Sequence, residues 1–279
     1  MNSCSCFHII FFVLHYLGYF AAIFIGLALG IMGGGGSILT VPVLVYLLGV
    51  SPVLSTAYSL FIVGSTALVG AAGYFRRGLV ALPTALVFLG PSLVAVFLTR
   101  RVLVPAIPYA LFTVGHLLVT KDLLVLVAFA LLMVAAATSM IWRTAANGGP
   151  AASNSNYPLV LGIGAVVGTL TGFVGAGGGF LIIPALVLGA RLPIQRAVGT
   201  SLAIIALNSL IGFAGDLGAG RAIDWAFLLV FLAFALTGIG LGTYLARFIP
   251  GARLKPAFGW FTLAMGTFIL AKELLFRPA

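Results

Sequence analysis

Two glycine-rich breaks interrupt apolar sequence and offer backbone amide groups as ligands for an anion. The first is Gly33-Gly34-Gly35-Gly36, and the second is Gly175-Ala176-Gly177-Gly178-Gly179. Runs of glycine free backbone N–H groups and permit positive φ, so successive amides can point into one concavity. The apolar helix expected after each break would present its N-terminus and the positive end of its dipole to the same place. These residue types and their spacing predict an anion-binding site.

Hydroxyl and amide side chains on two apolar segments could complete this site. Ser201 and Asn208 lie seven residues apart and share one helix face, and Ser59 and Thr66 occupy the equivalent positions earlier in the chain. Such hydroxyls can instead bond their own helix backbone, and an amide can join neighbouring helices. We hypothesise a single substrate site. Its expected residues are Gly33, Gly34, Gly35, Gly36, Ser37, Ser59, Thr66, Gly175, Gly177, Gly178, Gly179, Thr200, Ser201 and Asn208.

Other kinds of chemistry find little support in the sequence. No glycine run is followed by Lys-Ser/Thr, as an ATP-binding loop requires, and the three histidines and two cysteines do not form a metal-ligand pattern. We therefore expect no metal, no cofactor and no catalytic residues. Asp216 and Asp224 flank Arg221 at a segment boundary and are expected in a solvated loop. The scarcity of acids within apolar sequence favours an anionic substrate over a cation.

Composition places these residues in a membrane protein. Hydrophobic residues make up 62% of the 279 residues, charged residues only 6%, and the mean hydropathy is +1.27. A soluble domain carries roughly 25% charged residues. The net charge of +10 comes from basic residues mostly at segment ends. We interpret these as orientation anchors beside lipid headgroups and expect no nucleic-acid partner. The first apolar run is predicted to be a membrane span, not a signal peptide.

A sequence repeat with an offset of 142 residues organises the chain. Residues 26–45 and 168–187 match at nine of 20 positions, including both glycine runs and the prolines Pro42 and Pro184. We predict two similar halves, 1–143 and 159–279, joined by a polar linker at 144–158. Each half has five apolar segments. They are expected at 8–32, 38–49, 53–75, 79–104 and 122–142, and at 157–174, 180–190, 194–215, 225–249 and 256–275.

The second segment of each half is too short to cross a membrane as a straight helix. About twelve residues rise only ~18 Å, against a hydrocarbon core of ~30 Å. The fold class predicted is an all-α integral membrane protein of eight to ten spans, with glycine-broken or re-entrant helices meeting near the membrane centre. Five crossings per half would invert the second half, whereas four would leave the halves parallel. Lys and Arg divide eight to six between the two sides in both cases, so both topologies stay open.

The duplicated signature resembles the TauE/SafE family of sulfite and organosulfur-anion permeases. The resemblance is carried by GIMGGGGSILTVPVLV (30–45), GFVGAGGGFLIIPALV (172–187), AVGTSLAIIALNSLIGFAG (197–215) and PGARLK (250–255). It implies a multi-pass permease of the plasma (inner) membrane that moves sulfite, thiosulfate, sulfonates or related anions. The first half departs from the pattern at Tyr58, where threonine is expected, and this side chain could reshape the pocket. The 108–121 stretch has no counterpart in the second half.

Two classes of function follow from these features. The first is a secondary carrier or channel for small oxyanions, in contact with the lipid bilayer and with no other partner indicated. The alternative is a membrane-embedded enzyme or assembly scaffold without transport activity.

Overall fold

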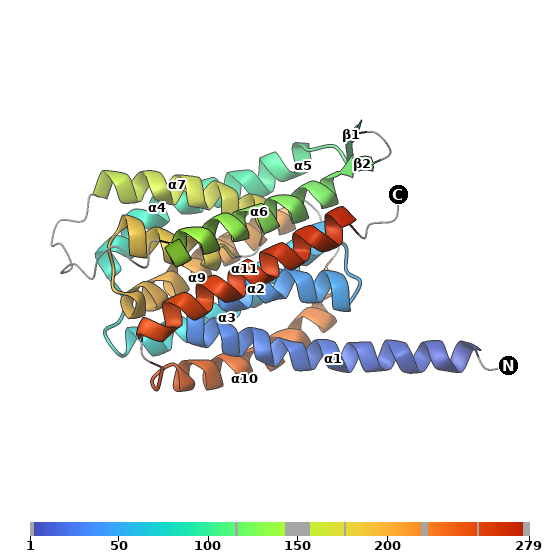
Figure 1. Ribbon diagram of the computed structural model, residues 1–279, viewed down its shortest axis with the longest axis horizontal. Coiled ribbons are helices and arrows are strands. Elements are labelled where there is room, and N and C mark those ends of the chain that lie inside the picture. Colours follow the sequence, from blue (N-terminus) through green and yellow to red (C-terminus); the bar gives the residue numbers. More distant parts are fainter. Residues whose placement is uncertain are drawn as a thin grey trace.

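The protein is a bundle of helices that run along one common direction, with both chain termini at the same end (Figure 1). The computed structural model describes residues 3–114, 117–142, 157–175, 177–218, 223–249 and 251–275. In the first half the helices are α1 (Ser3–Met32), α2 (Gly35–Pro42), α3 (Pro52–Phe75), α4 (Leu82–Leu98), α5 (Val104–Ala106) and α6 (Lys121–Trp142). In the second half they are α7 (Tyr157–Val174), α8 (Gly179–Pro184), α9 (Ile194–Gly218), α10 (Trp225–Leu245) and α11 (Gly251–Leu275).

Proline and π-helical turns shape the short helices that follow the glycine breaks. Each short helix ends at a proline, Pro42 in α2 and Pro184 in α8, and a π-helical turn follows directly at Val43–Leu47 and Ala185–Gly189. Proline lacks an N–H and its ring crowds the preceding turn, so the helix widens there. A third π-helical turn, Thr99–Leu103, joins α4 to α5. The apolar segment expected at 79–104 therefore continues as helix to Ala106.

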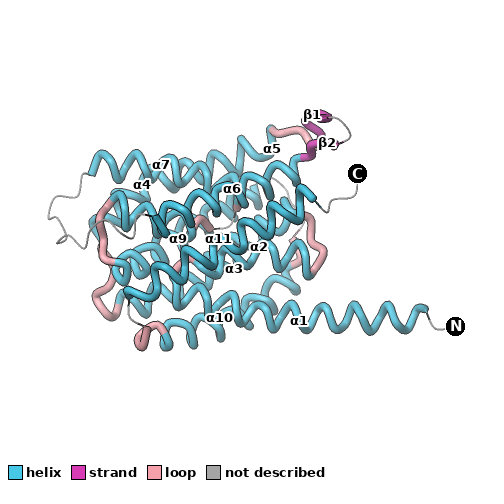
Figure 2. Tube along the Cα trace, viewed as in Figure 1, coloured by secondary structure: helices cyan, strands magenta, loops and turns pink. Residues whose placement is uncertain are grey.

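A small β-hairpin departs from the all-helical expectation. Strands β1 (Ala110–Val114) and β2 (Leu117–Thr120) pair antiparallel, with Ala110 opposite Thr120, between α5 and α6 (Figure 2). This is the stretch that the repeat left without a counterpart. The rest of the described chain is almost entirely helical.

Helix pairing follows one pattern in both halves. α3 and α9 pack antiparallel, because Gly64 of α3 lies against Ser209 of α9 while Gly199 of α9 lies against Tyr74 of α3. Outside this pair, α1 packs along α10 and α4 packs along α7. The glycine pairs Gly26/Gly30 and Gly168/Gly172 lie in these two contacts: a Cβ on Gly30 would meet the backbone of Gly242, and one on Gly168 would meet Ser92. Residues without a side chain let the helix backbones approach closely here.

The breaks, short helices and π-helical turns recur in the same order in both parts of the chain, and the long helices that follow them, α3 and α9, run in opposite directions. Break, short helix, π-helical turn and two long helices occur in the same sequence in each half. Yet α3 and α9, which correspond under the 142-residue offset, are antiparallel. The sequence left two topologies open, and these helix directions correspond to the inverted one. The expected linker lies outside the described residues, apart from the start of α7.

The surface and helix lengths fit a membrane. Five helical segments are long and apolar enough to cross, namely Pro52–Phe75, Leu82–Ala106, Lys121–Ser139, Ile194–Gly218 and Trp225–Leu245. Shorter apolar helices occur at Leu17–Met32, Gly36–Leu47 and Pro158–Val174. Large apolar side chains such as Phe20, Leu86 and Trp260 are more than half exposed. Such a surface belongs in lipid. The chain is a multi-pass membrane protein.

Candidate substrate site

The two glycine breaks meet inside the bundle, as the sequence predicts. A Cβ on Gly34 would lie 2.6 Å from the carbonyl of Gly179, and a Cβ on Gly179 would lie 2.6 Å from the Cα of Gly34. These two backbones can approach so closely only because neither residue carries a side chain. The start of α2 and the start of α8, far apart in the sequence, therefore share one location.

The first break lies against the beginning of α9. Gly33 has a φ of +70°, and a Cβ there would be 2.7 Å from the Val198 side chain and 3.1 Å from the Ser201 hydroxyl. Ser201 Oγ donates to the carbonyls of Val198 (2.8 Å) and Gly33 (3.3 Å). Ser37 Oγ donates to the Gly34 carbonyl (2.7 Å). The hydroxyls of this break are thus bonded to its own backbone carbonyls.

The second break is lined by hydroxyls that keep their bonding capacity. Gly177 has a φ of +66°, and a Cβ there would be 2.9 Å from Ser209 Oγ. Thr171 Oγ1 lies against Gly178 in the same way. Both hydroxyls are buried and have no hydrogen-bond partner among the described residues. A buried hydroxyl without a partner is costly and is therefore a natural point for a ligand to bind.

Two further polar groups near α9 add to this set. Ser59 Oγ is fully buried and has no partner in the described part of the chain. Asn208 joins α9 to α4 by donating from Nδ2 to Ser92 Oγ (2.6 Å), while its Oδ1 has no partner within the described ranges. The amide nitrogen of Asn208 therefore links two neighbouring helices, which is one of the two roles considered for it.

Several expected site residues make their contacts away from the breaks. Thr66 Oγ1 donates to the Ile62 carbonyl of its own helix (2.6 Å), and Thr200 Oγ1 accepts from the Ala81 amide before α4 (2.9 Å). A Cβ on Gly36 would clash with the α1 backbone, so this glycine serves the packing of α2 on α1. Gly35 begins α2. Both threonine hydroxyls are thus engaged in hydrogen bonds away from the breaks.

A buried ion pair beside the second break was missed by the sequence reasoning. Arg100 Nη1 donates to Asp216 Oδ2 (3.2 Å) and to Thr56 Oγ1 (3.1 Å), and Arg100 and Asp216 are both 0% exposed. The Arg100 guanidinium lies against Gly175. The expectation of a solvated loop is wrong for Asp216, and Arg100 is not among the surface anchors that we expected most basic residues to be. Arg221 lies outside the described residues.

The physical reasons for these errors are helix length and packing. α9 continues three residues past its expected end, to Gly218, so Asp216 lies in its last turn, and the π-helical turn after α4 places Arg100 beside it. A hint was available in the sequence, because opposite charges at the ends of two adjacent long segments can neutralise each other. The remaining acid of this group, Asp224, is exposed and caps α10 by accepting from the Phe227 amide (3.1 Å).

Tyr58 does not face the breaks. Its hydroxyl accepts from the Asp224 amide (2.9 Å), and its ring packs 5.8 Å from the Phe227 ring, between α3 and the start of α10. It therefore fixes the junction before α10 and leaves the shape of the breaks unchanged. Among the described residues, no cluster of three His, Cys, Asp or Glu is arranged to hold a metal ion.

Comparison with known proteins places this sequence in a family. The sequence matches the family described as "Sulfite exporter TauE/SafE" over residues 18–269. The chain belongs to the TauE/SafE family. Both glycine breaks and the Arg100–Asp216 pair lie within the matched region of this TauE/SafE protein.

Curated relatives resemble the chain over nearly its whole length. A "Probable membrane transporter protein" of Xylella fastidiosa (strain 9a5c) is 30% identical over 254 residues, which cover 88% of this chain and 91% of the relative. A protein of the same description from strain Temecula1 is 30% identical over 256 residues, with the same coverage. A shorter match, 39% over 85 residues, links the chain to the "Probable membrane transporter protein YdhB" of Bacillus subtilis. No solved structure matches the chain.

Proposed function

We propose that this TauE/SafE protein is a secondary carrier that moves a small oxyanion across the plasma membrane. The substrate that we propose is sulfite or an organosulfonate. The family description and the names of the curated relatives support a transporter. The contact between Gly34 and Gly179 is the observation that carries the proposal, because it brings both breaks together. Irregular backbone at membrane depth persists where it is buried in protein or lines a substrate path.

The chemistry of the surroundings suits an anion. Ser209 and Thr171 lie against the second break with hydroxyls available for a ligand, and Ser59 on α3 has a buried hydroxyl without a partner among the described residues. The Arg100 guanidinium, which is paired with Asp216, lies against Gly175. Hydroxyl and amide donors around a buried arginine bind an oxyanion well, since hydrogen bonds to a charged acceptor are the strong ones.

The breaks are closely packed, so transport requires them to move. Val198 lies on Gly33, and Val63 and Ser209 lie on Gly177. An anion reaching the hydroxyls must separate α8 from α3 and α9. Antiparallel halves that share one site can do so by rocking, which exposes the site to one face and then to the other.

Transport in proteoliposomes tests the proposal. Purified protein should accumulate labelled sulfite, thiosulfate or isethionate above the level of empty vesicles, and should not move sodium or neutral amines. Gly177→Val should abolish this transport, because the new side chain would meet Val63 and Ser209 and its φ of +66° disfavours any Cβ. Gly35→Val should do the same if the amides at the start of α2 contact the anion.

Gly73→Ala is the matched control, since a Cβ there meets nothing within 4 Å. Insertion and elution volume in detergent should be the same for all three variants. Full transport by a properly inserted Gly177→Val protein would show that the breaks serve packing only. Chemical conversion of the anion during passage would instead support the membrane-enzyme alternative.

A further inference from the structure

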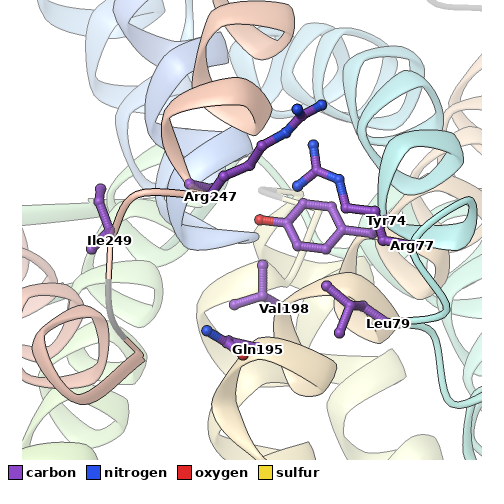
Figure 3. Close-up of a pocket in the computed structure, with 8 residues that line it drawn as sticks. Tyr74, Arg77, Leu79, Gln195, Val198, Arg247 and Ile249 are labelled. Carbon is purple, nitrogen blue, oxygen red and sulfur yellow. The ribbon is translucent and has the colours of Figure 1, made fainter.

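A cavity of about 240 Å³ opens at the end of the bundle where α3 and α10 end and α9 begins. Its walls include Tyr74, Arg77 and Leu79 from the end of α3 and the turn after it, Gln195 and Val198 from α9, and Arg247 from the turn after α10 (Figure 3). The volume suffices for a small oxyanion with some of its water. We call this space the vestibule.

Two guanidinium groups give the vestibule its charge. Arg77 Nη2 donates to the Thr243 carbonyl (3.2 Å), and its guanidinium carbon lies 5.6 Å from the centre of the Tyr74 ring, so the side chain is held in place. Arg247 is exposed and lies 5.2 Å from the ring centre of Tyr244. Both guanidinium groups lie at the same rim (Figure 3). The lining contains no acid, so the two cations favour an anion between them.

The floor of the vestibule adjoins the first glycine break. Val198 lines the cavity and also lies on Gly33. Tyr74 is 4% exposed and donates its hydroxyl to the Gly30 carbonyl (3.1 Å), one turn before the same break. An anion in the vestibule is therefore separated from the break by little more than the Val198 side chain.

Charges along the bundle strengthen the field at this end. The described acids, Asp122, Asp216, Asp224 and Glu273, all lie toward the opposite end, at the starts of α6 and α10 and the ends of α9 and α11 (Figure 1). A cleft lined by one sign of charge raises the local concentration of the opposite ion. Among the described side chains, the basic residues at the vestibule end are Arg76, Arg77, Arg191, Arg196 and Arg247.

We propose that the vestibule is a second binding site, where Arg77 and Arg247 bind a soluble oxyanion of the sulfite class before it reaches Gly33. The proposal rests on the proposed carrier function and assigns to it the site at which the substrate is first bound. A phosphate group from a lipid would offer the same chemistry, so the test must separate the two sources.

The experiment compares Arg77→Gln/Arg247→Gln with the wild-type protein in two assays. In lipid-free maltoside detergent, sulfite binding is followed by calorimetry. In proteoliposomes, the KM and kcat of sulfite transport are measured at low salt and at about 0.5 M salt, where exposed charges are screened. Loss of two partly exposed charge contacts should raise KM by about tenfold at low salt, with kcat little changed and the difference reduced at high salt.

Arg196→Gln is the matched control, because Arg196 is exposed at the same end, follows Gln195 directly and does not line the cavity. An unchanged KM in the double variant, or an equal rise in the control, would overturn the vestibule proposal. So would unchanged sulfite binding together with loss of co-purified phosphatidylglycerol, which would assign the pocket to lipid. If the wild type transports no anion, the carrier function fails, and the detergent assay alone decides whether the vestibule binds sulfite.

Discussion

The surroundings of Gly33 and Gly175 differ sharply, although both glycines begin a break in the same register of the repeat. Around Gly33 the neighbours are apolar or neutral, and the vestibule opens beyond Val198. Around Gly175 the corresponding space holds the Arg100 guanidinium, paired with Asp216. The offset of 142 residues places Arg100 opposite Gly242 and Asp216 opposite Tyr74.

The same backbone break is therefore followed by an open cavity at one end of the bundle and by a buried ion pair at the other. At the vestibule end, α1 and α10 approach through glycines and leave space above Val198. At the other end, a buried ion pair links α4 to α9 and fills the equivalent space. Buried charges are costly to separate unless water or another ion replaces the partner. We infer that the vestibule end is the accessible one in this conformation and that the ion pair closes the opposite end.

The largest expected difference between the two ends is their side of the membrane. Lys and Arg divide eight to six between the two ends, in favour of the vestibule end, so by the positive-inside rule we predict that this end faces the cytoplasm. Cys4 and Cys6 are the chain's two cysteines and lie at the start of α1, toward the other end. An impermeant maleimide should label them in intact cells. With both replaced by serine, a cysteine introduced by Arg196→Cys should be labelled only after the cells are permeabilised, and the reverse pattern would contradict this orientation.

Removal of the ion pair at one residue should cause the largest loss of stability. Asp216→Ala leaves the Arg100 charge buried without its carboxylate, which costs about 3–5 kcal/mol. Thermal unfolding in detergent, followed by loss of the monodisperse elution peak, measures the effect. The joint replacement Arg100→Met/Asp216→Leu should recover most of the loss, because apolar residues of similar volume often replace a buried pair without penalty.

Asp224→Asn provides the control for a change of charge alone. Asp224 is exposed, and its side chain caps α10 through the Phe227 amide, so asparagine keeps the cap. Its melting temperature should stay close to that of the wild type. An Asp216→Ala protein that melts as the wild type does would show that the pair is not needed to close this end.

The sequence predicted the framework of the fold better than the closure of its ends. Glycine runs, prolines and apolar segments are local signals, so the breaks, the short helices and the contact between Gly34 and Gly179 could be expected from them. The burial of Arg100 depends on where α4 and α9 end and on their packing, which no local pattern reports. The vestibule was missed because its lining comes from three helix ends that meet only in the folded chain.

The same limit of local sequence signals applies to the candidate site residues. Ser201 and Ser209 are both small hydroxyls on α9, yet the first bonds the Gly33 carbonyl and the second has no partner among the described residues. Thr66 bonds its own helix. Sequence alone could nominate these side chains by type and helix face, but it could not tell which hydroxyls are already satisfied.

The smallest expected effects separate these two serines. Ser201→Ala removes a hydrogen bond within the protein, so it should lower stability by about 1 kcal/mol and affect transport mainly through the position of Gly33.

Ser209→Ala removes a buried hydroxyl that bonds nothing in the described chain, so stability should stay level or rise slightly. If Ser209 contacts the anion, its loss should weaken anion affinity by about 1–3 kcal/mol, seen as a higher KM for sulfite. Equal KM values for wild type and Ser209→Ala would remove Ser209 from the site, and a higher KM in the Ser201→Ala protein alone would assign the binding surface to the first break. The two breaks would then differ in which one holds the anion as well as in how each end is closed.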